Sequence, residues 1–307
     1  MAMGSSRLLL LISPLLIQCY LTIAQPHPLY SVCSEGGNFT SNSTYKTNLD
    51  HLLTSLASDS DINYGFYNSS FGENNDQANA IALCRGDTKL VACTACVKNA
   101  HQVLRQRCPN QKEAIIWYDD CMLRYSDRNI FGNSESRPYF WMYNLNNISK
   151  VDQFSQALNA LLTNLTRIAS SGDSRLKFAF GNSTTTSKDT IYALVQCTPD
   201  LSKLQCSNCM NDTIQLIPKC CTGRQGGRVY TPSCQFRYEK DIFYDPAAVS
   251  SPQPSAAKSV PPPGPVGSTP TSPAPTSTSG ISGRGSNIFV TFGTFFILIY
   301  GLRRLQT

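Results

Sequence analysis

Two stretches of the chain repeat apolar residues at the three- and four-residue spacing of an amphipathic helix. The first stretch consists of Leu49, Leu52, Leu53 and Leu56. The second is longer and contains Phe154, Leu158, Leu161, Leu162, Leu165 and Ile168. Because such stripes face the core of a soluble protein, we expect two helices that bury these side chains.

Residues 114–125 and 227–238 are rich in aromatic and β-branched residues with alternating character, which predicts strands. A second helix is expected after each Cys-x-x-Cys, over 95–107 and 208–217. Two helices packed on an antiparallel sheet in each half of the chain predict the α+β class.

Both ends of the chain differ from the middle. Residues 1–24 have a basic residue, an apolar run and a small residue at the end, as in a secretory signal peptide; an uncleaved anchor is the alternative. Residues 247–286 form a Pro/Ser/Thr-rich stalk. The apolar segment 287–302 precedes two arginines, and we interpret it as a short membrane anchor, a GPI signal or a tail that never anchors.

The cysteines repeat at one fixed offset of 113 residues. The matched pairs are Cys84/Cys197, Cys93/Cys206, Cys96/Cys209, Cys108/Cys221 and Cys121/Cys234. The chain is therefore a tandem of two copies of one disulfide-stapled unit, which we place at 28–132 and 138–246.

Secretion follows from the cysteine count and the glycosylation sequons. Of 13 cysteines, only Cys19 lies in the predicted signal peptide, which leaves the even number 12 for an oxidising compartment. Seven sequons permit N-glycosylation at Asn38, Asn42, Asn68, Asn147, Asn164, Asn182 and Asn211. All 20 acidic but only 21 of the 26 basic residues lie within 25–245, so this part carries a charge of +1. Nucleic-acid binding therefore loses its electrostatic driving force.

The spacing Cys-x8-Cys-x2-Cys occurs at Cys84 and again at Cys197, and Cys234-Gln-Phe-Arg-Tyr-Glu follows downstream. These motifs resemble the plant ginkbilobin-homologous, or stress-antifungal, domain. Two copies in tandem resemble the ectodomain of cysteine-rich receptor-like kinases and the cysteine-rich repeat secretory proteins, and we expect no kinase domain. The resemblance implies two helices on a five-stranded antiparallel sheet in each copy. It implies the disulfides Cys33–Cys108, Cys84–Cys93, Cys96–Cys121, Cys197–Cys206 and Cys209–Cys234.

Repeat 2 departs from this pattern at one disulfide. The offset maps Cys33 onto Asn146, so Cys221 lacks its partner, while Cys220 is an additional cysteine. The alternatives are a vicinal Cys220–Cys221 disulfide, two unreactive free thiols, a labile redox element and an intermolecular bridge.

Catalysis and metal binding have little support. A thioredoxin-like use of Cys-x-x-Cys and a zinc site both require cysteines that the implied disulfides occupy. We therefore expect no enzyme, no metal and no cofactor. The acidic pair Asp119-Asp120 is expected on a strand, where neighbouring side chains face opposite sides and cannot form an acid/base dyad.

Carbohydrate binding is a more specific hypothesis than catalysis or metal binding. In the family's single-domain antifungal member, an Asn after the first Cys, an Arg and a Glu bind mannose. In repeat 1 the corresponding residues are Ser34, Ile115 and Ser126, so we expect that repeat 1 has lost the mannose site. In repeat 2 they are Asn147, Arg228 and Glu239. Arg donates hydrogen bonds and Glu accepts them, as sugar hydroxyls require. The alternative is that Arg228 and Glu239 form a cross-strand ion pair, and a glycan on Asn147 would block its amide.

These observations predict a non-enzymatic extracellular binding or co-receptor module in plant stress or defence signalling, tethered through its C-terminus at the outer face of the plasma membrane. A mannose-type glycan and a cell-surface receptor kinase are the expected partners. The alternatives are a mannose-type defence lectin with antifungal action, a plasmodesmata-located membrane protein and an apoplastic redox sensor that uses Cys220 and Cys221.

Overall fold

The structure is a computed structural model that describes residues 27–58 and 64–247. The predicted signal peptide, most of the predicted stalk and the predicted anchor at 287–302 lie outside these residues. Within the described residues, no helix has both the length and the apolar character that crossing a bilayer requires.

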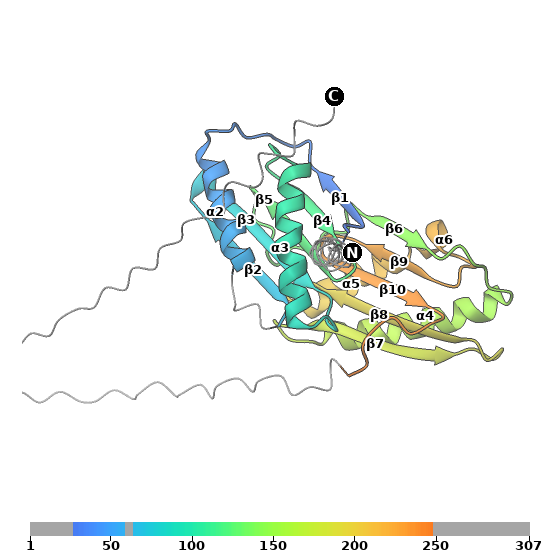
Figure 1. Cartoon of the computed structure of the whole chain (residues 1–307). Coiled ribbons are helices and arrows are strands. Elements are labelled where there is room, and N and C mark those ends of the chain that lie inside the picture. Colours follow the sequence, from blue (N-terminus) through green and yellow to red (C-terminus); the bar gives the residue numbers. More distant parts are fainter. Residues whose placement is uncertain (1–26, 59–63, 248–307) are drawn as a thin grey trace, which may run out of the picture. The chain divides into compact units, whose positions relative to one another are not determined.

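Repeat 1 is an antiparallel five-stranded sheet in the order β1-β4-β5-β3-β2. Helices α2 and α3 lie side by side over this sheet (Figure 1). The elements are β1 (Tyr30–Cys33), α2 (Thr44–Ser58), β2 (Phe66–Phe71), the 3-10 turn η1 (Asn74–Asp76), β3 (Ala78–Cys84), α3 (Leu90–Arg107), β4 (Ala114–Trp117) and β5 (Cys121–Ser126).

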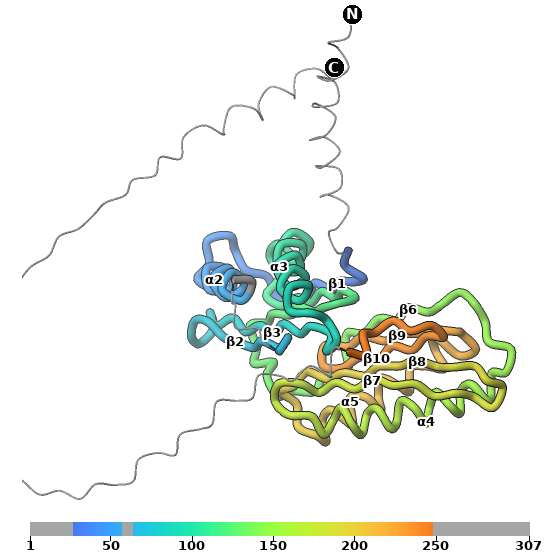
Figure 2. Tube along the Cα trace, turned by 60° about the horizontal axis from the view of Figure 1, so that its bottom comes forward, coloured from blue at the N-terminus to red at the C-terminus, as the bar shows by residue number. Residues whose placement is uncertain are grey.

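Repeat 2 has the same architecture, with the strand order β6-β9-β10-β8-β7. Figure 2 shows α4 running along this sheet, where it packs against β7 and β8. The elements are β6 (Phe140–Tyr143), α4 (Val151–Ser170), β7 (Lys177–Thr184), β8 (Thr190–Cys197), α5 (Lys203–Ile214), the short α6 (Ile217–Cys220), β9 (Gly227–Tyr230) and β10 (Cys234–Glu239). The predicted α+β fold, with five antiparallel strands per repeat, is confirmed.

The second helix of each repeat begins earlier than predicted. Helix α3 starts at Leu90 and α5 at Lys203, so each Cys-x-x-Cys lies inside the helix and not before it. In repeat 2, Ser202 starts the helix with a capping box, in which its side chain accepts from the Gln205 backbone and the Gln205 side chain accepts from the Ser202 backbone. Segments 114–125 and 227–238 are hairpins of two strands each.

The predicted apolar stripes form the core with one exception. Both stripes are buried between helices and sheet, except for Ile168, which is 45% exposed. Near the end of α4 the buried face passes through Ala169 and Ser170, one position further along the helix. The prediction for Ile168 was therefore wrong.

Among the described residues, five disulfides tie the helices to the sheets, and a sixth joins two neighbouring cysteines. They are Cys33–Cys108, Cys84–Cys93 and Cys96–Cys121 in repeat 1, and Cys197–Cys206, Cys209–Cys234 and Cys220–Cys221 in repeat 2. Cys220 and Cys221 are thus joined to each other as the vicinal pair.

Strand register explains why Cys221 lacks the partner that Cys108 has. Trp117 pairs with Tyr30, and its equivalent Tyr230 pairs with Phe140, so the first strands are offset by 110 residues and not 113. Tyr143 therefore stands where repeat 1 has its first cysteine, and no thiol faces Cys221 from β6.

The helix itself is also interrupted in repeat 2. Helix α3 is continuous, whereas its counterpart splits into α5 and α6. Pro218 lies in the first turn of α6. A proline has no backbone N–H and cannot continue the preceding helix, which accounts for the break.

The repeats share buried contacts. One apolar cluster contains Phe66, Ile81, Leu83, Ile115, Trp117, Met122 and Ile130 from repeat 1 together with Tyr230 from repeat 2. The Trp117 indole donates to the Thr231 carbonyl at 3.3 Å, and the buried Gln196 amide donates to the Cys84 carbonyl at 2.9 Å. Buried polar groups with partners fix the register of such a contact.

Candidate functional site

A pocket of about 210 Å³ lies where strands β6, β9 and β10 of the second sheet meet. It is lined by Met142, Tyr143, Asn144, Gly227, Arg228 and Glu239. Arg228 alternates with the core residue Val229, so its side chain leaves the sheet on the face opposite the helices. Two of the three predicted carbohydrate-binding residues, Arg228 and Glu239, therefore meet in one cavity.

Asn144, and not Asn147, completes this pocket. The Asn144 backbone N–H donates to the Gly226 carbonyl at 2.9 Å, as the Ser34 N–H does to the Glu113 carbonyl at 2.9 Å in repeat 1. Asn144 is therefore the structural counterpart of Ser34, the residue after the first cysteine. The assignment to Asn147 was wrong because the constant offset of 113 does not hold in the first strand.

Asn147 lies in the loop that follows β6. Its side-chain oxygen accepts a hydrogen bond from Arg224 at 2.9 Å, and it does not line the pocket. All seven sequon asparagines, at 38, 42, 68, 147, 164, 182 and 211, are exposed. A glycan on Asn147 would thus be attached outside the pocket lining, whereas the Asn144 side chain lines the pocket and its oxygen accepts from the Asn146 backbone N–H at 3.0 Å.

The expected Arg228–Glu239 ion pair does not form. Arg228 and Arg237 are directly paired residues on β9 and β10. Arg228 donates to Asp119 at 2.8 Å, and Arg237 donates to Asp119 at 3.2 Å and to Glu239 at 3.2 Å. A carboxylate of repeat 1 therefore forms ion pairs with two arginines of repeat 2.

Asp119 and Asp120 lie in the turn between β4 and β5, and not on a strand as predicted. Arg85 approaches both carboxylates, at 3.6 and 3.8 Å, and forms its shortest ion pair with Asp87 at 2.6 Å. Burial raises the pKa of Asp120, the nearby Asp119 and Asp87 carboxylates raise it further, and Arg85 opposes them. The turn is thus an electrostatic contact between the repeats.

Gly226 provides the space for the Glu239 carboxylate. A Cβ built on Gly226 would run into that carboxylate, which lies directly over the glycine backbone. The close approach holds Glu239 beside Arg237 at the pocket wall. Glycine is needed here because of contact, and not because of an unusual φ angle.

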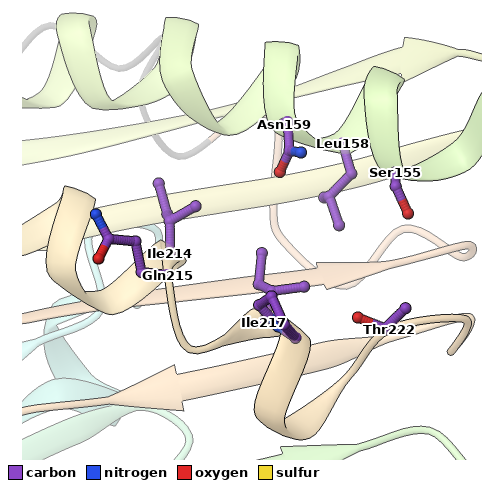
Figure 3. A pocket seen from close by; sticks show the side chains of 8 residues that line it. Ser155, Leu158, Asn159, Ile214, Gln215, Ile217 and Thr222 are labelled. Atoms are coloured by element: carbon purple, nitrogen blue, oxygen red, sulfur yellow. The ribbon is translucent and has the colours of Figure 1, made fainter. Parts of the chain in front are cut away.

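A further pocket, of about 340 Å³, lies between α4 and the broken end of the second helix. In Figure 3, Leu158 from α4 faces Ile214 and Ile217, while Ser155 and Thr222 lie at one end. No charged side chain lines this pocket. It follows from the helix break and offers apolar surface with few polar groups.

The family model described as Salt stress response/antifungal matches residues 32–128 and 142–241. Cysteine-rich receptor-like protein kinase 26 from Arabidopsis thaliana is 43% identical over 251 residues, which cover 80% of this chain and 38% of that protein. Cysteine-rich repeat secretory protein 38 from the same plant is 43% identical over 212 residues, covering 69% and 83%. An antimicrobial ginkbilobin-2-like protein from Castanea crenata is 41% identical over 219 residues, covering 71% and 89%.

Two solved structures, both of Arabidopsis thaliana tandem DUF26 ectodomains, share the fold. That of the cysteine-rich receptor-like protein PDLP8 has a TM-score of 0.60 and 19% identity, covering 69% of this chain and 97% of that chain. That of PDLP5 has a TM-score of 0.55 and 26% identity, covering 69% and 98%.

This chain spans only 38% of the first receptor-like kinase, and the matches show no enzyme domain. The fold and these relatives are those of secreted or receptor-like extracellular proteins. The chain therefore belongs to the Salt stress response/antifungal family and carries two copies of its domain.

Proposed function

We propose that this chain is a non-enzymatic extracellular recognition module, and that the pocket of repeat 2 is its ligand site for a sugar of mannose type. The observation that carries the proposal is the convergence of Asn144, Arg228 and Glu239 on one cavity of about 210 Å³. The amide both donates and accepts, the guanidinium donates and the carboxylate accepts. Such a set matches the mixed donor and acceptor character of neighbouring sugar hydroxyls.

The test is mannan retention and glycan-array binding by the full chain. Asn144→Ala and Arg228→Ala should each abolish retention, whereas Asn147→Gln should leave it intact and remove one glycosylation site. This pair of asparagines is a matched control, because only Asn144 lines the pocket. Retention that survives Arg228→Ala, or that is lost with Asn147→Gln instead of Asn144→Ala, contradicts the assignment.

A second role, as co-receptor for a cell-surface receptor kinase in stress or defence signalling, is favoured by the edge strand β6. β6 is the first strand of its sheet, and Trp141 and Tyr143 on it are 36% and 44% exposed. Exposed apolar edge strands are sites at which another chain can add. Trp141→Lys should abolish capture of an identified receptor-kinase ectodomain, while Leu204→Lys, at an exposed residue of α5, should not.

A further inference from the structure

Repeat 1 has its own pocket, of about 250 Å³, at the place equivalent to the sugar pocket of repeat 2. Strand pairing gives four equivalent positions in the two linings: Val32 and Met142, Ser34 and Asn144, Ala114 and Gly227, Ile115 and Arg228. The site in repeat 1 is therefore not closed, but lined by different residues.

Four charged residues form one side of this pocket, and they neutralise one another. Arg124, only 3% exposed, donates to Glu113 at 2.7 Å and to Glu135 at 2.6 Å. Arg128 donates to the same two carboxylates at 2.9 and 2.7 Å. All four oxygens of Glu113 and Glu135 accept hydrogen bonds from these arginines. Every carboxylate oxygen is thus engaged by an arginine, which makes both carboxylates weaker acceptors for a ligand hydroxyl.

These contacts also favour the ionised form of Glu135. Burial would raise the pKa of Glu135, but the hydrogen bonds from Arg128 and Arg124 outweigh burial, and the pKa is lowered. The hydrogen bonds that Arg128 donates to Glu135 and Glu113 raise the pKa of Arg128 against the opposing effect of burial. Two negative and two positive charges therefore cancel at neutral pH.

Arg137 supplies the remaining charge. Among residues 27–58 and 64–247, the structure records no ion pair for Arg137, whose guanidinium lies 5.3 Å from the centroid of the Tyr139 ring. A cation–π contact holds the guanidinium plane and leaves its edge N–H groups available. An arginine fork of this kind binds a carboxylate through two parallel hydrogen bonds.

We propose that the repeat 1 pocket binds a carboxylated sugar of the hexuronate type, with Arg137 as the carboxylate ligand. Val32 and Ile115 form apolar walls for the ring face, and the Ser34 hydroxyl, which accepts from the Gly36 N–H at 3.2 Å, retains its proton to donate to a ring hydroxyl. The volume suits one sugar residue, since pockets for drug-sized ligands start near about 300 Å³. This second site does not rest on the sugar site of repeat 2.

The experiment measures binding of free galacturonate, a galacturonate oligomer and a neutral galactose oligomer to the full chain by calorimetry. The galacturonate oligomer should bind and the neutral oligomer should not. Arg137→Gln should lower the affinity by about 10- to 100-fold, since a hydrogen bond to a charged group contributes about 1.5–3 kcal/mol. Lys98→Gln removes an equal charge from the exposed face of α3 in the same repeat and should have no effect.

The outcomes separate the two sites. Both sites are supported if Arg137→Gln loses uronate binding but keeps mannan retention, and if Arg228→Ala loses mannan retention but keeps uronate binding. Absence of uronate binding in the wild type, equal binding of the neutral oligomer, or equal losses with Arg137→Gln and Lys98→Gln overturns the repeat 1 site, whatever mannan shows. Binding of the oligomer and of free galacturonate identifies a single-sugar pocket. Binding of free galacturonate alone identifies a small acid, and not a polymer, as the natural ligand.

Discussion

Replacing Asp119 by Asn should destabilise the molecule, because this single carboxylate forms ion pairs with arginines of both repeats. It lies 2.8 Å from Arg228, 3.2 Å from Arg237 and 3.6 Å from Arg85. The isosteric amide keeps the shape of the turn and removes only the charge. Arg228 and Arg237 would then face each other as like charges across adjacent strands, which is unfavourable.

The magnitude follows from exposure. Asp119 is 46% exposed, while its two partners in repeat 2 are largely covered. Exposed ion pairs contribute about 0.2–1 kcal/mol each, and breaking a buried pair costs about 3–5 kcal/mol. We expect an intermediate loss of about 1–2 kcal/mol for the group, which lowers the unfolding midpoint by about 2–8 °C in a domain of this size.

Asp120→Asn in the same turn is the matched control. The raised pKa of Asp120 shows that the folded state disfavours its charge, and Arg85 keeps Asp87 as its partner. Removing that charge should therefore leave the midpoint unchanged or raise it slightly. Differential scanning calorimetry of both variants decides the matter. Equal shifts for the two substitutions, or no shift for Asp119→Asn, would refute the reasoning.

Three further predictions concern the sugar pocket of repeat 2, the charged cluster of repeat 1 and the disulfides. Gly226→Ala should displace the Glu239 carboxylate and abolish mannan retention, with a folded protein by circular dichroism. Because the pKa of Glu135 is lowered in the folded state, the stabilisation that its charge provides is complete above the ordinary carboxyl pKa and is lost as the pH falls through the lowered value. The urea midpoint of the wild type should therefore fall as the pH drops below about 4.5, and the midpoint of Glu135→Gln should fall less steeply. Tyr143→Cys should attack the Cys220–Cys221 bond by thiol–disulfide exchange, which joins position 143 to Cys221 and releases Cys220 as a free thiol. Mass spectrometry of non-reduced peptides should show this exchange, and the closed loop should stabilise the fold by up to about 4.5 kcal/mol.

Much of the fold could be predicted because its signals are local or repeated. The helix stripes, the hairpin segments and the cysteine offset of 113 all lie in the sequence itself. The early start of α5 also had a local signal, since Ser202 and Gln205 have the spacing of a capping box. A helix that starts only after the cysteine motif does not use this signal.

The site was harder to predict. Arg228 and Glu239 follow from the resemblance, but Asn144 does not, because the cysteine that would mark its position is replaced by Tyr143. The pairing of Phe140 with Tyr230 and the hydrogen bond of Asn144 to Gly226 reveal the three-residue difference in the first strand. The contact of Asp119 with Arg228 joins residues that lie 109 positions apart in two different repeats, so no local sequence pattern predicts it.

Both repeats place an arginine of the hairpin beside a carboxylate, but different strands supply that carboxylate. Arg237 pairs with Glu239 from its own strand at 3.2 Å, whereas the equivalent Arg124 pairs with Glu113, before β4, at 2.7 Å. At the offset of 113, Glu113 corresponds to Gly226. In both repeats a carboxylate thus lies beside the hairpin arginine, but it comes from β10 in repeat 2 and from the residue before β4 in repeat 1.

These two arrangements exclude each other, because the Glu239 carboxylate lies where any side chain on Gly226 would begin. Ser126→Glu alone in repeat 1 should therefore crowd a second carboxylate against Glu113, lower the unfolding midpoint and create no mannan binding. Combining Ser126→Glu with Glu113→Gly removes the crowding, so this double variant should regain part of the midpoint lost in the single variant. If the single variant is as stable as the wild type, the carboxylates do not compete for one space, and the equivalence of the two pockets is wrong.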